Sequence, residues 1–223
     1  MLTKFEAVSD DGWACWAFSN HDVVRHASRW SLEEPAKRIY AALLMCLRGS
    51  VCLYQGEELG LTEAYVAYEE LQDPYGIRFW PKFKGRDGCR TPIPWVQDNQ
   101  NGGFTEGKPW LPVAMEHLGR AAMGQANDPD STLQFYRAML GFRARHPVLA
   151  KGSLTVHEAR EDYLALIREL DGKRLFCAFN LGDADQQITL PRGNWTQDKG
   201  APFAVLDATT LPPWQAWFGL ADA

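Results

Sequence analysis

Two short apolar segments near the start of the chain each end abruptly in polar residues, and a helical segment lies between them. Residues 13–19 lead into Asn-His-Asp at 20–22, and residues 51–54 lead into Gln-Gly-Glu-Glu at 55–58. Apolar residues recur at helical spacing over about 35–48. Strand–helix–strand order with polar groups after each strand predicts a parallel α/β unit. Because only two such strands are visible, this segment is expected to be the end of a larger sheet or barrel.

The pattern of apolar and turn residues changes after a predicted helix at 131–146. Short strand-like runs separated by turn residues follow, a pattern typical of an antiparallel β-sandwich. These runs cover 153–157, 163–168, 174–180, 187–190, 203–206 and 214–218. The predicted fold class is therefore α/β followed by all-β. The predicted domains are 1–147 and 148–223.

Composition excludes several classes of protein. The 223 residues carry a formal net charge of −5, and no run of Lys and Arg forms a basic stripe, which argues against a nucleic-acid partner. No apolar run approaches the ~20 residues of a membrane span. The five cysteines form no C-x-x-C pair, so neither a zinc site nor a disulfide framework is indicated. The start at 1–6 lacks the apolar stretch of a signal peptide, and a cytoplasmic protein is expected.

Three segments together carry a resemblance to a known family. They are Phe-Ser-Asn-His-Asp at 18–22, Tyr-Gln-Gly-Glu-Glu-Leu-Gly at 54–60, and Gly-Arg-Asp-Gly-Cys-Arg-Thr-Pro-Ile-Pro-Trp at 85–95. In this order and spacing they resemble the α-glucosidase and oligo-1,6-glucosidase branch of glycoside hydrolase family 13. The resemblance implies a (β/α)8 barrel, of which this chain is expected to hold strands 7 and 8 with their helices and loops. A C-terminal β-sandwich is expected to follow.

The resemblance also implies a chemistry. Family members are retaining glycosidases, which need a carboxylate nucleophile and a carboxylic acid about 5–5.5 Å apart. The family supplies these after strands four and five, and neither motif is present in this sequence. The residue that remains is Asp22, whose family role is to grip sugar hydroxyls and stabilise the positively charged transition state. Without a family context, a loop-anchoring or helix-capping role would be favoured for Asp22.

Basic residues around Asp22 are the expected sugar-binding groups. His21 is expected to hydrogen-bond a ring hydroxyl, with a packed structural histidine as the alternative. Arg86 is favoured for contact with the sugar and Arg90 for loop structure, since a guanidinium can bind two hydroxyls or one carboxylate in a fork. For Arg25, a substrate role and a loop-anchoring role stay open.

Other residues are expected to support the site. Asn20 belongs to the same motif, and Asp87 is expected to orient one of the loop arginines. Glu57 and Glu58 could be misread as an acid/base pair, but consecutive side chains normally diverge, so Glu58 is interpreted as a structural acid. Several tryptophans could be either stacking platforms or loop packing, namely Trp80, Trp95 and Trp110.

The resulting expectation is the C-terminal fragment of an α-glucosidase that releases or transfers glucose from α-glucoside oligosaccharides. No metal and no cofactor is required by that chemistry. With one of three carboxylates, the chain is expected to be inactive alone. Two alternatives stay open. One is a non-catalytic β-sandwich module for interaction or barrel stabilisation. The other is half of a split enzyme, with a separate chain supplying barrel strands 1–6.

Overall fold

The computed structural model describes residues 2, 4, 12–207 and 209–222. The prediction that residues 1–6 are not a signal peptide falls mostly outside this part, which includes only residues 2 and 4 of the six. The helices are α2 (His26–Arg29), α3 (Glu34–Cys46), η1 (Tyr68–Glu70), α4 (Pro74–Phe79), η2 (Asp87–Cys89), α5 (Met115–Leu118), α6 (Ala122–Asn127), α7 (Thr132–Arg145) and α8 (Pro147–Lys151). The strands are β1 (Cys15–Trp16), β2 (Ser50–Val51), β3 (Ser153–Arg160), β4 (Tyr163–Leu170), β5 (Lys173–Asn180), β6 (Gln186–Gln187), β7 (Thr196–Gln197), β8 (Thr210–Leu211) and β9 (Ala216–Asp222).

The chain divides into two compact units that interleave along the sequence. One unit comprises the described residues of Met1–Trp16, Pro35–Cys52 and Tyr136–Ala223. The other comprises Ala17–Glu34 and Leu53–Phe135. In sequence order, the second unit is thus made of the two segments that follow β1 and β2. The boundary at 147 divides the chain differently and stays a prediction.

The predicted parallel strand pair is present but short. β1 and β2 are parallel, with Cys15 opposite Ser50 and Trp16 opposite Val51. The residues of both strands are exposed or half-buried. A parallel pair is normally covered by neighbouring strands and helices. Within the described residues β1 and β2 pair only with each other, so their outer edges stay open.

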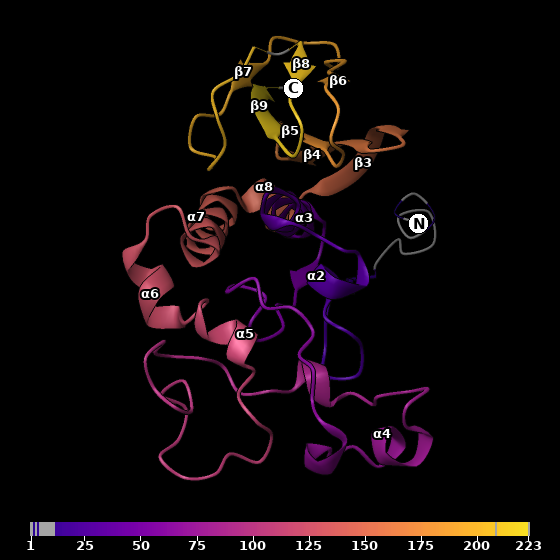
Figure 1. The fold of residues 1–223 in the computed structure, drawn as a ribbon. Helices are drawn as coiled ribbons and strands as arrows, with labels where there is room; N and C mark the ends of the chain where they lie inside the picture. The colour runs from indigo at the N-terminus through magenta and orange to yellow at the C-terminus, as the bar shows by residue number, and fades with distance from the viewer. Residues whose placement is uncertain (1, 3, 5–11, 208, 223) are drawn as a thin grey trace. The chain divides into compact units, whose positions relative to one another are not determined.

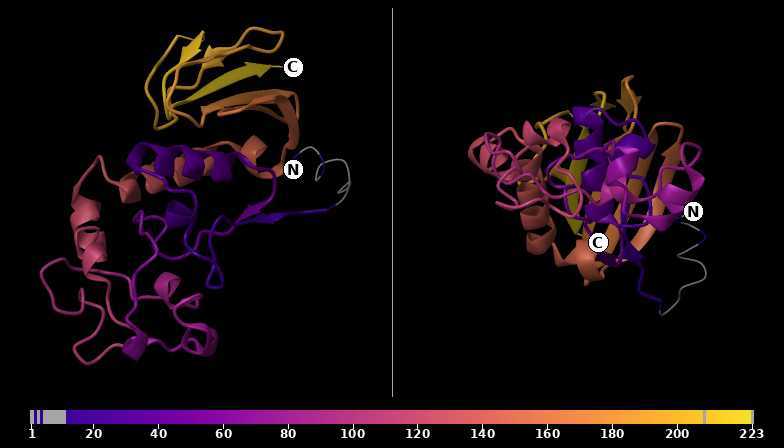
Figure 2. Two further views of the ribbon diagram at one scale, coloured as in Figure 1. Left: turned by 45° about the vertical axis from the view of Figure 1, so that its right-hand side comes forward. Right: turned by 60° about the horizontal axis from the view of Figure 1, so that its bottom comes forward.

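Helix α3 confirms the predicted helix between these strands, and α7 confirms the one predicted at 131–146. The two helices lie side by side (Figure 2). The guanidinium of Arg143 on α7 donates to the carbonyls of Met45, Leu47 and Gly49 at the end of α3. These carbonyls have no partner within α3, so Arg143 fixes the point where the chain leaves the helix toward β2.

The C-terminal region is an antiparallel sheet of five strands in the order β3-β4-β5-β9-β7 (Figure 1). A two-stranded sheet of β6 and β8 accompanies it. Alternate side chains of the central strand β5 face opposite sides. Phe176 packs in a core with Trp217 and with Leu211 of the small sheet, while Phe179 contacts Phe218, which also contacts Phe142 of α7. Both faces of β5 are therefore covered.

Two of the predicted strands differ from the structure. Of the run at 187–190, only Gln187 lies in a strand, β6. Residues 203–206 form no strand, because side-chain bonds replace a ladder there. Gln197 donates to the carbonyl of Ala204 and accepts from the amide of Leu206, and Phe203 packs against Phe218. The region instead contains β7 and β8, which are only two residues long and gave no sequence signal.

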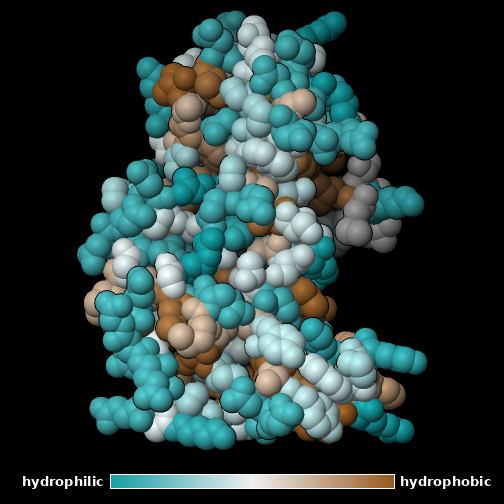
Figure 3. All heavy atoms as spheres, in the orientation of Figure 1, coloured by the Kyte–Doolittle hydropathy of each residue, from teal (hydrophilic) through white to brown (hydrophobic). Residues whose placement is uncertain are grey.

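Hydrophilic side chains cover most of the face shown in Figure 3, with hydrophobic patches between them. No helix in the described part of the chain is long and apolar enough to cross a membrane.

Candidate functional site

The Asn-His-Asp segment is a tight turn in the second unit. Asn20 Oδ1 accepts the backbone N–H of Asp22 at 2.8 Å, which folds the segment back on itself. Before it, Ser19 Oγ accepts the backbone N–H of His26 at 2.8 Å and so anchors the start of α2. Between these anchors the side chains of His21 and Asp22 are exposed, at 69% and 50% respectively. The turn therefore presents both side chains to solvent.

Three basic side chains contact the carboxylate of Asp22. Its Oδ1 accepts from Arg86 at 2.9 Å and from Arg90 at 3.1 Å, and His21 Nε2 lies 3.3 Å from Oδ2. Arg90 also donates from Nε to the carbonyl of His21 at 2.7 Å. The structure thus brings together Asp22, His21, Arg86 and Arg90. With Oδ1 held by two arginines, Oδ2 faces His21 and solvent.

Asp73, which the sequence did not indicate as a site residue, holds the side chain of Arg86 in place. Its Nε and one terminal nitrogen form a fork with the two oxygens of Asp73, at 2.9 and 3.0 Å. The backbone N–H of Arg86 donates to Asp73 as well. Asp73 is buried, and the hydrogen bonds from Arg86 lower the pKa of this carboxyl to about 2. The same bond raises the pKa of Arg86 above its ordinary value. Arg86 is therefore a fixed bridge between Asp73 and Asp22.

Asp87 acts on this bridge indirectly. Its Oδ2 accepts the backbone N–H groups of Gln72 at 2.7 Å and Asp73 at 2.8 Å, and the residue is fully buried. Instead of bonding an arginine, as the sequence suggested, Asp87 fixes the backbone that carries Asp73. Its effect on Arg86 passes through that residue.

Two glycines allow the loop around Arg86 to close. A Cβ on Gly85 would lie 2.8 Å from the Cα of Gly76, and Gly85 has φ +80, a left-handed conformation that favours glycine. A Cβ on Gly76 would lie 2.7 Å from the carbonyl oxygen of Lys84. This close backbone approach brings Arg86 next to Asp73.

Arg25 lies elsewhere in the unit. It is only 1% exposed, and its guanidinium donates to the carbonyls of Gln55 at 2.7 Å and Cys89 at 2.9 Å. Its backbone N–H donates to Glu63, a second residue that sequence reasoning missed. Burial lowers the pKa of Arg25 and raises that of Glu63. This placement fits the loop-anchoring alternative, because Arg25 ties three loops together rather than facing Asp22.

The adjacent glutamates point to different partners. Glu58 Oε2 accepts the backbone N–H of Gly56 at 2.8 Å, the kind of loop-amide contact expected of a structural acid. Glu57 is buried, and its Oε1 lies 3.5 Å from His26 Nδ1. Neither carboxylate touches the cluster around Asp22. In the described residues no group of three His, Cys, Asp or Glu side chains has the arrangement of a metal site.

Asp73 and Glu63 gave weak sequence signals. Asp73 precedes a proline and caps α4, with its Oδ1 accepting the N–H of Tyr75 at 3.2 Å. An Asp-Pro pair indicates a turn or the start of a helix. That pattern does not reveal the second role of Asp73, which is to bind Arg86. Glu63 lies in a loop without periodicity, and only the tertiary structure shows its contact with Arg25.

Comparison with known proteins identifies the class. Residues 1–152 match the model of the alpha-amylase catalytic domain. A probable alpha-glucosidase from Rhizobium meliloti is 47% identical over 98% of this chain and 41% of its own length. An oligo-1,6-glucosidase from Heyndrickxia coagulans is 29% identical over 94% of this chain and 42% of its own length. The chain thus spans about two fifths of the curated relatives it matches.

Solved structures agree. The alpha-glucosyl transfer enzyme XgtA superposes with a TM-score of 0.91 at 46% identity, over 99% of this chain and 42% of that one. The trehalulose synthase MutB from Pseudomonas mesoacidophila gives a TM-score of 0.83 at 26% identity, over 98% of this chain and 45% of its own. The protein belongs to the alpha-amylase family, glycoside hydrolase family 13. Within it, its relatives are alpha-glucosidases and glucosyl transfer enzymes.

Proposed function

We propose that this chain is the C-terminal part of a retaining α-glucosidase and carries its transition-state-stabilising carboxylate, Asp22. In this proposal β1 and β2 are barrel strands 7 and 8. The nucleophile and the general acid belong to the three fifths of the relatives that this chain does not match. The chain alone is therefore inactive. The complete site removes or transfers glucose from the non-reducing end of short α-glucosides.

The cluster around Asp22 is the observation that carries the proposal. A carboxylate stabilises the developing positive charge of an oxocarbenium-like transition state. Two arginines hold Oδ1, which fixes the orientation of the group before a sugar arrives. Oδ2 is then the oxygen that accepts a sugar hydroxyl, beside His21. Such pre-set geometry lowers the reorganisation needed in the transition state.

Arg86 has two roles in this account. The fork with Asp73 removes its freedom to move, and the remaining nitrogen bonds Asp22. It therefore positions Asp22 and lies beside the same sugar. Arg90 holds both the carbonyl of His21 and the carboxylate of Asp22, so it fixes the turn as well as the charge.

A split enzyme, with a second chain supplying barrel strands 1–6, is the other candidate. The open edges of the parallel pair β1 and β2 favour it, since unpaired edges of this kind invite a further strand. A non-catalytic role for the five-stranded sheet has no comparable observation in its favour.

Release of p-nitrophenol from p-nitrophenyl α-glucoside tests the proposal. The purified 223-residue chain is assayed alone and together with a second chain, the part of the Rhizobium meliloti relative that precedes its match. We expect no turnover by either chain alone and turnover by the mixture or by the two parts fused. Turnover by the isolated chain that vanishes in Asp22→Ala would overturn the claim that catalysis needs the missing part.

A further inference from the structure

A polar cavity lies in the same unit as Asp22, and residues from 69–72 and 100–113 line it. Its volume is about 230 Å³. Glu69, Glu70 and Gln72 line one side, and Asn101 and Trp110 line the other. Neither Asp22 nor the arginines that hold it contribute to this cavity, so the cluster described above does not account for it.

The walls of the cavity are joined by a small apolar core beneath them. Leu71 is 6% exposed and packs with Leu111, which is 1% exposed. Each of these leucines is flanked by cavity-lining residues, Glu70 and Gln72 on one segment and Trp110 and Pro112 on the other. Leu111 is turned into the core, whereas its neighbour Trp110 is turned out, with 67% of its surface exposed.

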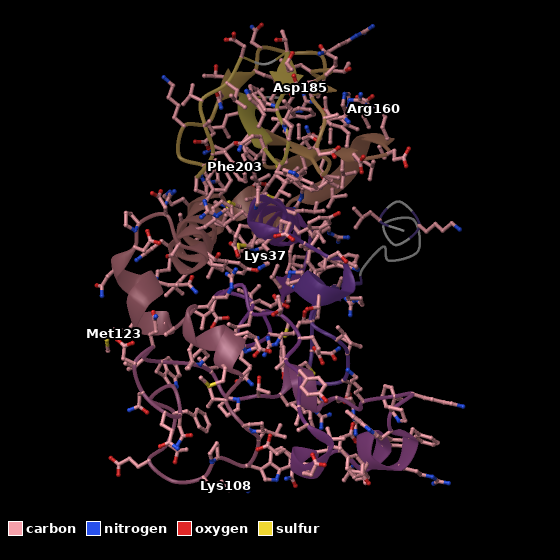
Figure 4. All side chains as sticks on the ribbon, viewed as in Figure 1. Lys37, Lys108, Met123, Arg160, Asp185 and Phe203 are labelled. Atoms are coloured by element: carbon pink, nitrogen blue, oxygen red, sulfur yellow. The ribbon has the colours of Figure 1, made fainter. Side chains whose placement is uncertain are left out.

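The loop that carries Trp110 is held in shape by its own hydrogen bonds. Asn101 donates from Nδ2 to the carbonyls of Thr105 at 3.0 Å and Gly107 at 2.9 Å. Its backbone N–H donates to Asn99. Both Nδ2 hydrogens are thus used by the loop, and Asn101 itself lines the cavity. Lys108 lies at the outer rim of this loop (Figure 4).

The chemistry of the lining selects a ligand class. The carboxylates of Glu69 and Glu70 and the oxygen of Asn101 accept hydrogen bonds, so a ligand rich in hydroxyl donors is favoured. Two carboxylates against one lysine disfavour an anion. An exposed indole offers a broad apolar face with little conformational entropy to lose. A polyhydroxylated ring with an apolar face, a pyranose, satisfies all three conditions.

The cavity is also connected to the Asp22 cluster through the backbone. The N–H of Gln72 at its wall and the N–H of the next residue, Asp73, donate to the same oxygen of Asp87. Asp73 in turn holds Arg86 against Asp22. The buried carboxylate of Asp87 therefore fixes the backbone at the cavity wall and, through Asp73, the position of Arg86.

We propose that this cavity is a saccharide subsite, with Trp110 as its stacking platform, for a sugar unit other than the glucose at Asp22. It deepens the proposed function and rests on it for the choice of an α-glucoside. The unit bound here is a further ring of the oligosaccharide or an acceptor sugar. Glu69 or Glu70 and Asn101 accept hydrogen bonds from its hydroxyls.

Binding of maltose and maltotriose to the 223-residue chain, measured by saturation-transfer difference NMR, tests the proposal without catalysis. We expect millimolar binding that Trp110→Ala weakens about 10-fold and that Trp110→Phe largely retains. Trp95→Ala is the matched control, since Trp95 is also exposed, at 52%, in the same unit but outside the cavity. Circular dichroism and thermal unfolding check that each variant keeps its fold.

The outcomes separate this subsite from the proposed function. Binding that Asp22→Ala leaves within about twofold but Trp110→Ala weakens supports the subsite, even if no combination of chains turns over p-nitrophenyl α-glucoside. Binding that Asp22→Ala abolishes and Trp110→Ala leaves intact overturns the subsite and places the sugar at Asp22 instead. Absence of saccharide binding by the folded chain overturns the subsite as well.

Discussion

Asp73 and Arg86 form a forked ion pair in which the carboxylate is completely buried and the guanidinium still reaches outward to Asp22. Both Asp73 oxygens are used, at 2.9 and 3.0 Å, and the backbone N–H of Arg86 adds a third bond. The pair converts a flexible side chain into a fixed part of the site.

Asp73→Asn is expected to destabilise the protein by about 3 kcal/mol, because it replaces one of the two buried carboxylate oxygens that accept from Arg86 with an amide nitrogen that cannot accept. Urea unfolding of the wild type and the variant measures this difference. Asp98→Asn is the matched control, since Asp98 is an exposed aspartate of the same unit, and its effect should stay within about 0.5 kcal/mol. Equal effects of the two substitutions would show that the ion pair contributes nothing.

The Asp73 pair should also give the unfolding free energy a defined pH dependence. Its folded pKa is lowered to about 2 from 3.8, so the folded state binds this proton less readily than the unfolded state. The stabilisation is therefore fully present above about pH 4 and is lost as the pH falls toward 2, and it amounts to about 2 kcal/mol. Urea unfolding from pH 2 to 6 should show the gap between wild type and Asp73→Asn narrowing in that window. A gap that stays constant would contradict the assignment.

Gly85→Ala is expected to destabilise the loop by about 1–3 kcal/mol, because the new Cβ meets the Gly76 backbone and the left-handed conformation is strained. Gly124→Ala is the control of opposite sign. Gly124 lies in α6 with nothing within 4 Å of an added Cβ, so alanine should stabilise by about 0.5–1 kcal/mol. Thermal unfolding of both variants checks the prediction, and a neutral Gly85→Ala would argue against the close approach.

Arg168 lies in the other unit, and Arg168→Met is expected to lower the free energy of unfolding by about 3–5 kcal/mol. Arg168 is fully buried on β4 and donates to the carbonyls of Cys46, Leu149, Gly152 and Ser153. Methionine fills similar space but satisfies none of them. Arg137→Met, at an exposed position of α7, is the control and should change the unfolding free energy by less than about 0.5 kcal/mol. A small effect of Arg168→Met would mean that water replaces these bonds.

Periodicity predicted the regular elements well where side chains alone determine them. Helices α3 and α7 and strands β3, β4 and β5 carry clear patterns of apolar residues, and their bounds lie close to the expected ones. The two-residue strands β7 and β8 could not be predicted, because they are defined by pairing with distant segments rather than by local sequence. The strand expected at 203–206 did not form, because the side chain of Gln197 binds its backbone in place of a neighbouring strand.

The sequence predicted the exposed residues of the site but not the buried residues that hold them in place. Asp22, His21, Arg86 and Arg90 stand in recognisable motifs, and the structure brings them together. Asp73 precedes Arg86 by 13 residues in a loop, and no local pattern indicates that pairing. Arg25 stood in a motif as well, but whether its side chain points outward or inward depends on the loops that pack around it.

We propose that Asp22, held by Arg86 and Arg90, stabilises the transition state of glucoside cleavage. The most direct measurement is kcat/KM for p-nitrophenyl α-glucoside in a fusion of this chain with the part of the Rhizobium meliloti relative that precedes its match. The account predicts that Asp22→Asn and Asp22→Ala each lower kcat/KM by about 1,000-fold or more, mostly in kcat, with unchanged unfolding temperature. An active fusion whose kcat falls less than about tenfold in both variants would contradict it.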